Sequence, residues 1–403
     1  MPAPAMGSST PMWSPGPRAW SRSGLHHLGL LQLLTGLLAL TTGVATAGLP
    51  KTLPYVPTTI LLPTTDQIPI GGKAKGPEVA YIFAPGTEDN GEEVEFLKVN
   101  LTSKLKADNL APTRVTKSLP FVSKGSINQA FTPLILENGT LAIVKGDCSS
   151  SSTTPELWKY NPLDPKAEWT HQQITIPHSF SYDNGFPAHL GAAFSFSPQL
   201  APSLSSPEIY LYAGMCPNET AKALPSSSWL SAATYSNAMI RLSPVTSPSS
   251  SAVEEYAPSV VTPPNASKNN GGGFTPLPEA GFSLTQLTPS LTKLGDGTVT
   301  QQTRHLLLGG QTAEAFVNMS TAALFSLPDE TWRYVSIAGP IPSGGEVLLG
   351  EVESRSGHTA VLSEDGKKIV VFGGWVGDIY TAAQPQLVVL EVGVGGDGWV
   401  WEV

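Results

Sequence analysis

The chain has 403 residues, with 23 Lys and Arg against 32 Asp and Glu, and a formal net charge of −9. It contains no basic run or arginine-rich stripe, so the counterion release that drives nucleic-acid binding is missing and we expect no nucleic-acid partner. A chain of this length exceeds a usual single core, which favours a core built from repeated modules.

The N-terminal residues have the pattern of a secretory signal. Arg18 and Arg22 precede an apolar run at 28–40, which is too short to cross a bilayer as a helix. Small residues follow and end in Ala45-Thr46-Ala47, a match to a signal-peptidase site. We therefore predict a signal peptide at 1–47, cleaved after Ala47, and a protein of the secretory pathway, extracellular or at the cell surface. An uncleaved signal anchor is the main alternative.

No later segment approaches 18 consecutive apolar residues, so we expect no membrane span after the signal within this chain. Residues 48–74 form a Pro/Thr-rich lead-in, in which 53–63 can supply one strand. Five glycosylation sequons follow, which fits export and surface exposure. The sequon asparagines are Asn100, Asn138, Asn218, Asn265 and Asn318.

Beyond the signal, short β-branched and apolar runs are separated by Gly, Pro, Asn and Asp, a pattern typical of many short strands. An apolar strand that ends in glycine recurs five times, and this recurrence indicates a repeat architecture. The copies are VAYIFAPG (79–86), LAIVKGD (141–147), IYLYAGM (209–215), HLLLGGQ (305–311) and IVVFGGW (369–375).

The spacing of these copies is about 60 to 70 residues, except for one longer interval. That interval contains 242–280, a Ser-, Pro-, Asn- and Gly-rich stretch that we predict to be a surface insertion. Asn138-Gly139 joins the second glycine strand to the strand before it, and the dipeptide predicts a hairpin with a two-residue type I′ turn. Cys148 and Cys216 follow the glycine strands of consecutive units at equivalent positions, so a disulfide between them is geometrically feasible.

Each glycine strand is followed by a third strand that mixes polar and apolar residues. These third strands are EFLKVNL (95–101), ELWKYNP (156–162), NAMIRLS (237–243), AALFSLP (322–328) and QLVVLEV (386–392). A tryptophan closes the second, fourth and fifth units, at Trp169, Trp332 and Trp399. Four strands in about 60 residues, closed by a Trp, describe one blade of a β-propeller.

These units resemble kelch repeats. The last one is the clearest, with Arg355-Ser356-Gly357-His358-Thr359-Ala360, a strand, the Gly373-Gly374 pair and a closing Trp. The resemblance implies an all-β, kelch-type propeller over 75–403 with about five recognisable four-stranded blades, most similar to secreted or single-pass membrane kelch proteins of fungi. It also implies structural motif residues at Gly309, Gly310, Gly373, Gly374, Tyr160, Trp169, Trp332, Trp399 and His358.

Kelch propellers usually have six or seven blades, so the sequence leaves open whether the propeller is closed. A continuation beyond Val403, which could include a membrane anchor, is one explanation. Paired glycines let a strand leave the sheet near the crowded axis. The third-strand aromatic and the Trp are expected to fill the wedge between blades.

The resemblance also raises one enzymatic alternative, a copper radical oxidase similar to galactose oxidase. That chemistry needs two His, two Tyr and a cross-linked Cys at the axis, and neither cysteine is placed for it. We interpret His358 as a structural hydrogen-bonding residue and His305 as a core or rim residue whose hydrogen bonds are satisfied. We expect no catalytic residue, metal or cofactor, and interpret the chain as an extracellular or lumenal module that binds a protein or glycan. A structural cell-wall-associated glycoprotein remains a further alternative.

Overall fold

The computed structural model describes residues 58–63, 78–85, 94–102, 112–116, 119–122, 129–148, 155–178, 180, 189–201, 206–216, 232–245, 255–262, 276, 279–338, 352–393 and 398–402. The predicted signal peptide and most of the lead-in lie outside these residues. So do two of the five sequon asparagines, Asn218 and Asn265. The named elements of the described part are all β-strands, which confirms the all-β class.

Five four-stranded antiparallel sheets follow one another along the chain. Sheet 1 contains β1 (Thr59–Leu61), β2 (Val79–Pro85), β3 (Val94–Asn100) and β4 (Thr113–Thr116). Sheet 2 contains β5 (Gln129–Ile135), β6 (Leu141–Asp147), β7 (Glu156–Tyr160) and β8 (Thr170–Gln173). Sheet 3 contains β9 (Ala192–Phe196), β11 (Glu208–Cys216), β12 (Thr234–Val245) and β13 (Glu255–Val260).

Sheet 4 contains β14 (Ser283–Gln286), β16 (Val299–Leu308), β17 (Thr321–Leu327) and β18 (Thr331–Ala338). Sheet 5 contains β19 (Thr359–Leu362), β20 (Lys368–Phe372), β23 (Leu387–Glu391) and β24 (Trp399–Glu402). In every sheet the strands are ordered as they occur in the chain, and the predicted glycine strand is the second of the four. This arrangement is consistent with a β-propeller.

The second strand of each sheet is apolar along its whole length because neighbouring sheets cover both of its faces. In β6, for example, Leu141, Ala142, Ile143 and Val144 are all fully buried. Large apolar clusters fill the spaces between successive sheets. One lies between sheets 1 and 2, one between 2 and 3, one between 3 and 4, and one between 4 and 5.

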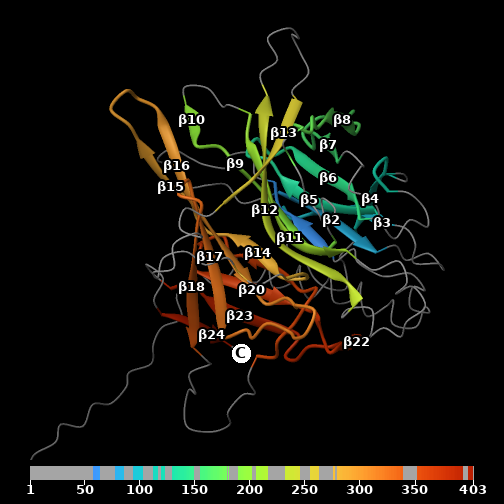
Figure 1. Cartoon of the computed structure of the whole chain (residues 1–403), viewed down its shortest axis with the longest axis vertical. Helices are drawn as coiled ribbons and strands as arrows, with labels where there is room; N and C mark the ends of the chain where they lie inside the picture. Colours follow the sequence, from blue (N-terminus) through green and yellow to red (C-terminus); the bar gives the residue numbers. More distant parts are fainter. Residues whose placement is uncertain are drawn as a thin grey trace, which may run out of the picture.

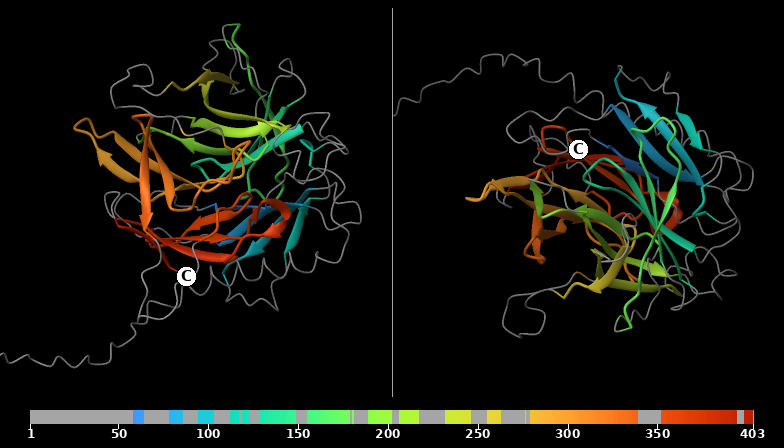
Figure 2. Two further views of the ribbon diagram at one scale, coloured as in Figure 1. Left: turned by 60° about the horizontal axis from the view of Figure 1, so that its bottom comes forward. Right: turned by 90° about the horizontal axis from the view of Figure 1, so that it is seen from above.

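The first strands of successive sheets lie against one another, and the last of them returns to the first. Thr359 Oγ1, at the start of β19, donates a hydrogen bond of 2.7 Å to the carbonyl oxygen of Thr58, just before β1. Figure 2 shows the red strands of sheet 5 beside the blue strands of sheet 1. The lead-in thus supplies β1, the innermost strand of sheet 1, and sheets 1 and 5 are neighbours.

Sheets 4 and 5 are also joined at their outer strands, where β18 pairs with β24 in parallel through Ile337 and Trp399. On the other side, β15 (Ser290–Lys293) and β10 (Gln199–Ala201) both pair with the first half of β16. The hairpin of β15 and β16 projects from the body of the molecule (Figure 1). Its tip carries Leu294, which is exposed.

Two predictions about local structure are wrong. The stretch 242–280 is not wholly a surface insertion, because β13 lies inside it and buries Tyr256 completely against sheet 2. The hairpin at Asn138-Gly139 forms, but its loop is longer than two residues. Gly139 alone has positive φ, at 80°, and its N–H donates to Leu136 O, which is the pattern of a type I turn followed by a left-handed residue.

Candidate functional site

The candidate site lies at the glycine end, by which we mean the end of sheets 3, 4 and 5 where β11, β16 and β20 finish. Three short bridges repeat there, between His189 and Met215, Ala280 and Gln311, and Ser356 and Trp375. Each joins the turn before a first strand to the residue after a glycine pair. The next residue in each turn, Leu190, Gly281 or Gly357, has a φ between 57° and 68°. The three turns therefore share one local fold.

Backbone hydrogen bonds link these turns from sheet to sheet. Gly281 N–H donates to Leu190 O at 2.8 Å, and Gly357 N–H donates to Gly281 O at 2.7 Å. The glycine strands add a second set, in which Gly214 N–H donates to Glu279 O at 2.9 Å and Gly310 N–H to Arg355 O at 2.8 Å. The glycine end is thus a continuous rim across three sheets.

The paired glycines are required by this rim. A Cβ on Gly310 would lie 2.9 Å from Phe282 Cβ, and one on Gly374 would lie 2.9 Å from Ser356 O. Both also have positive φ, at 96° and 89°. Sheet 3 has the same geometry without a double glycine, because Ala213 takes the first position at a φ of 55°.

Two buried basic residues hold the last turn. Arg355 is fully buried and donates to the carbonyl oxygens of Glu353, Gly373 and Gln384, each at 3.2 Å. His358 Nε2 lies 2.9 Å from Ser283 Oγ on β14, so its hydrogen bond joins sheet 5 to sheet 4. Burial, together with the charge of Arg355, lowers the pKa of His358 to about 3, so the imidazole is neutral.

The motif aromatics lie between sheets. Trp169 contacts Phe83 and Phe96 of sheet 1 at ring-centroid distances of 6.4 and 5.7 Å, and Tyr160 contacts Phe96 at 5.6 Å. Trp332 is 4.9 Å from Tyr212 of sheet 3. Trp399 is buried in the cluster between sheets 4 and 5.

A disulfide joins Cys148 of sheet 2 to Cys216 of sheet 3, with their Cα atoms 5.3 Å apart. The three described sequon asparagines, Asn100, Asn138 and Asn318, are exposed. In each, Oδ1 accepts a hydrogen bond of 2.8–3.0 Å from the N–H of the Ser or Thr two residues later.

The glycine end also holds polar groups whose hydrogen bonds are incomplete. Gln311 Nε2 donates to Tyr235 OH at 2.9 Å, but Gln311 Oε1, Ser356 Oγ and Trp375 Nε1 are buried and bond to no residue in the described ranges. The rings of Tyr235 and Trp375 are both half-buried and pack on the same apolar cluster. Amide, hydroxyl and indole groups beside two partly exposed rings are groups that recognise polar ligands.

Glu279 lies at the same end and was not predicted from the sequence. It is 4 % exposed, its Oε2 has no partner among the residues described, and burial raises its pKa to about 8. Its charge in turn contributes to a raised pKa of Tyr212, after burial of that ring. Its position before a glycine turn equals that of Arg355, but the two residue types share no signal that a sequence pattern would reveal.

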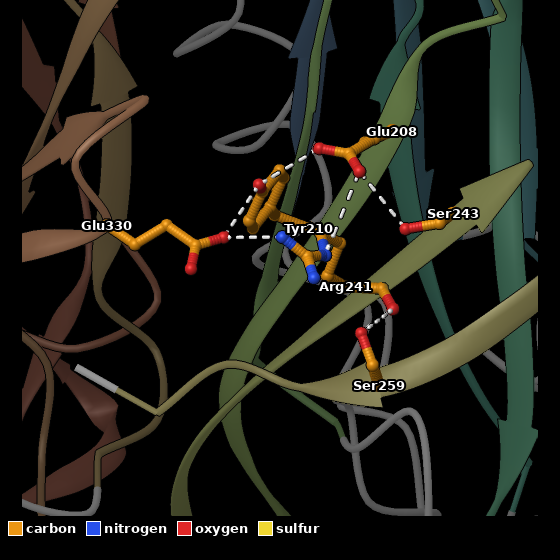
Figure 3. A network of polar contacts seen from close by, with 6 residues as sticks. All are labelled: Glu208, Tyr210, Arg241, Ser243, Ser259 and Glu330. Atoms are coloured by element: carbon orange, nitrogen blue, oxygen red, sulfur yellow. Dashed lines mark hydrogen bonds and ion pairs between the residues drawn. The ribbon is translucent and has the colours of Figure 1, made fainter. Parts of the chain in front are cut away.

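A second polar group bridges sheets 3 and 4 (Figure 3). Arg241 Nη1 lies 2.9 Å from Glu330 Oε1, and Arg241 Nε lies 3.8 Å from Glu208 Oε1. Tyr210 OH lies between the two carboxylates, 3.2 Å from Glu208 and 3.1 Å from Glu330. Burial, and then the two carboxylates, raise the pKa of Tyr210, which keeps its hydroxyl protonated as a hydrogen-bond donor.

His305 differs from its predicted role. It is fully buried in the middle of β16 and stacks on Phe194 with ring centroids 3.9 Å apart. Neither ring nitrogen has a hydrogen-bond partner within the described part of the chain, so the prediction of a satisfied histidine is wrong. Burial lowers its pKa to about 3.

Among the described residues, no three His, Cys, Asp or Glu side chains come together as a set of metal ligands. Nor do these residues include a helix long and apolar enough to cross a membrane.

No family model matches this sequence, and no curated protein matches it. Two solved structures are similar over most of the chain. A periplasmic gluconolactonase of Pseudomonas aeruginosa, PpgL, is 11 % identical with a TM-score of 0.31, and the match covers 85 % of this chain and 81 % of that one. The polysaccharide lyase Uly1 is 9 % identical with a TM-score of 0.25, with coverage of 85 % and 75 %.

Proposed function

We propose that this chain is a kelch-type propeller that works as a non-catalytic interaction module, extracellular or lumenal, and binds a protein or glycan at its glycine end. The observation that carries the proposal is the pairing of Trp375 and Tyr235, half-buried, with the incomplete hydrogen bonds of Gln311, Ser356 and Trp375. Such groups are worth most to a ligand when a rigid frame holds them, and the linked turns supply that frame.

An oxidising compartment is supported by independent features. The Cys148–Cys216 bridge would persist outside the reducing cytosol. The exposed asparagines of three sequons are available for glycosylation, which the secretory pathway performs. The N-terminal pattern predicts entry into that pathway.

The proposal is tested with purified secreted protein on an array of glycans and on extracellular proteins of the producing organism. Trp375→Phe removes one N–H donor but keeps an aromatic ring, and we expect it to weaken binding roughly tenfold, the effect of one hydrogen bond to a ligand. Trp399→Phe makes the same chemical change between sheets 4 and 5 and should leave binding unchanged.

Two results would contradict the proposal. Equal loss of binding in both variants would mean that folding, and not the glycine end, controls affinity. Stoichiometric copper together with oxidase activity would favour the radical-oxidase alternative instead.

A further inference from the structure

Glu137 occupies a junction of three sheets at the end of the molecule opposite the glycine end. It lies in the turn between β5 and β6 of sheet 2. Its Oε1 accepts hydrogen bonds from Ser197 N–H, at 2.7 Å, and from Gln301 Nε2. Ser197 follows β9 of sheet 3, and Gln301 lies on β16 of sheet 4. Residues 60 and 164 positions away along the chain thus meet at one carboxyl oxygen.

The hydrogen bonds of this junction are unbalanced. Glu137 Oε2 and Gln301 Oε1 are both buried, and neither bonds to a residue that the structure describes. Both belong to the same pair of side chains, and both are acceptors when the carboxyl group is ionised. Two buried acceptors without a donor are costly to fold.

No charged group compensates for a negative charge here. Ser197 and Gln301 are the neighbours that affect the carboxyl group, and both are neutral. Thr303 and His305 continue along the same face of β16, and His305 is neutral because burial lowers its pKa. Burial of Glu137 raises its pKa to about 7.

We propose that Glu137 is a neutral carboxylic acid in the folded protein and forms a two-point hydrogen-bonded ring with the amide of Gln301. Gln301 Nε2 donates to Glu137 Oε1, and the proton on Glu137 Oε2 is donated to Gln301 Oε1. One proton satisfies both unpartnered oxygens while Ser197 N–H keeps its bond. The inference is independent of any ligand and of the proposed function.

The ring makes the junction sensitive to pH. When the proton is lost, two acceptors face each other without a donor in a buried place, and the three sheets are held less tightly. The folded junction is therefore favoured in mildly acidic surroundings and loosened above the pKa of Glu137.

Infrared spectroscopy tests the protonation directly. Glu279→Gln protein is the background, because it removes the other buried carboxyl group with a raised pKa. At about pH 6 we expect a C=O band of a protonated carboxyl group. Glu137→Gln should remove the band, and Glu364→Gln, at an exposed position, should leave it. Absence of a band that depends on Glu137 would show an ionised carboxylate and overturn the proposal.

Amide hydrogen exchange at Ser197 tests the consequence. In the wild type, exchange corrected for its intrinsic pH dependence should accelerate as pH rises from about 5 to about 8. Glu137→Gln keeps the acceptor for Ser197 and can donate to Gln301 Oε1, so its corrected exchange should be flat over that interval. Equal pH dependence in wild type and variant would overturn the latch, whatever the infrared result.

Discussion

The boundary between sheets 1 and 2 and the boundary between sheets 3 and 4 fill the same kind of wedge with different chemistry. The first contains aromatic rings from both sides, with Phe83, Phe96, Phe121 and Trp169 in mutual contact. The second also has an apolar centre, but polar and ionisable side chains close it at both ends. An apolar wedge is insensitive to pH, whereas the polar one couples the packing of two sheets to protonation.

The largest expected effect is on the aromatic boundary. Phe96 is fully buried and stacks on Phe83 with ring centroids 4.6 Å apart. Phe96→Ala removes this contact and leaves a cavity, so we expect a loss of about 3–5 kcal/mol in the free energy of unfolding. Chemical denaturation measures it, and the loss should be the same at about pH 6 and at about pH 8. A pH-dependent loss would contradict the contrast between the two boundaries.

The polar boundary should instead respond to pH itself. Glu279 has a pKa of about 8 in the folded protein against 4.5 for an unperturbed carboxyl group. An acid with a raised pKa binds its proton more tightly when folded, so stability is lost as pH rises from 4.5 to about 8.

The two buried histidines act in the opposite direction, because the unfolded chain binds their protons below 6.5. The clean interval for Glu279 is therefore from about pH 6.5 to about pH 8. The loss there should be about 2 kcal/mol, at 1.36 kcal/mol per pH unit for one proton. Glu279→Gln should remove most of this loss in thermal or chemical unfolding. A variant as pH-dependent as the wild type would exclude Glu279 as the cause.

Thr303 tests whether the polar boundary is dry. Its Oγ1 is buried and bonds to no other described residue. Thr303→Val keeps the shape and removes an unsatisfied hydroxyl group, so the protein should gain about 1 kcal/mol. Thr359→Val is the control, because Thr359 Oγ1 does donate a hydrogen bond, and its removal should destabilise. A loss at Thr303 as well would indicate that water satisfies this hydroxyl group.

The contrast between the boundaries also separates what the sequence can and cannot predict. The four-stranded units follow from local signals, since apolar runs ending in glycine and the strands after them are visible in single segments. The turn at 189–191 escaped notice because His-Leu-Gly shares no residue pattern with Arg-Ser-Gly, although both adopt the same backbone geometry. The conformation is fixed there by bonds to the next sheet.

The junction at Glu137 escaped for a different reason. Its partners lie 60 and 164 residues away, and each is an ordinary surface residue type in its own segment. Their burial is created only when three sheets assemble. The disulfide was easier to foresee because Cys148 and Cys216 follow the same repeat feature in neighbouring units.

The smallest effect is expected at the outer edge of the polar boundary. Arg241 and Glu330 pair across sheets 3 and 4, but their side chains are 34 % and 23 % exposed. Water and salt therefore screen the attraction, and Glu330→Gln should cost less than about 1 kcal/mol. Because the remaining electrostatic term is screened, the cost should shrink further between about 0.05 M and about 1 M salt. A large, salt-independent loss would mean that Glu330 acts through its bond with Tyr210 inside the wedge, and that the buried polar region extends to this edge.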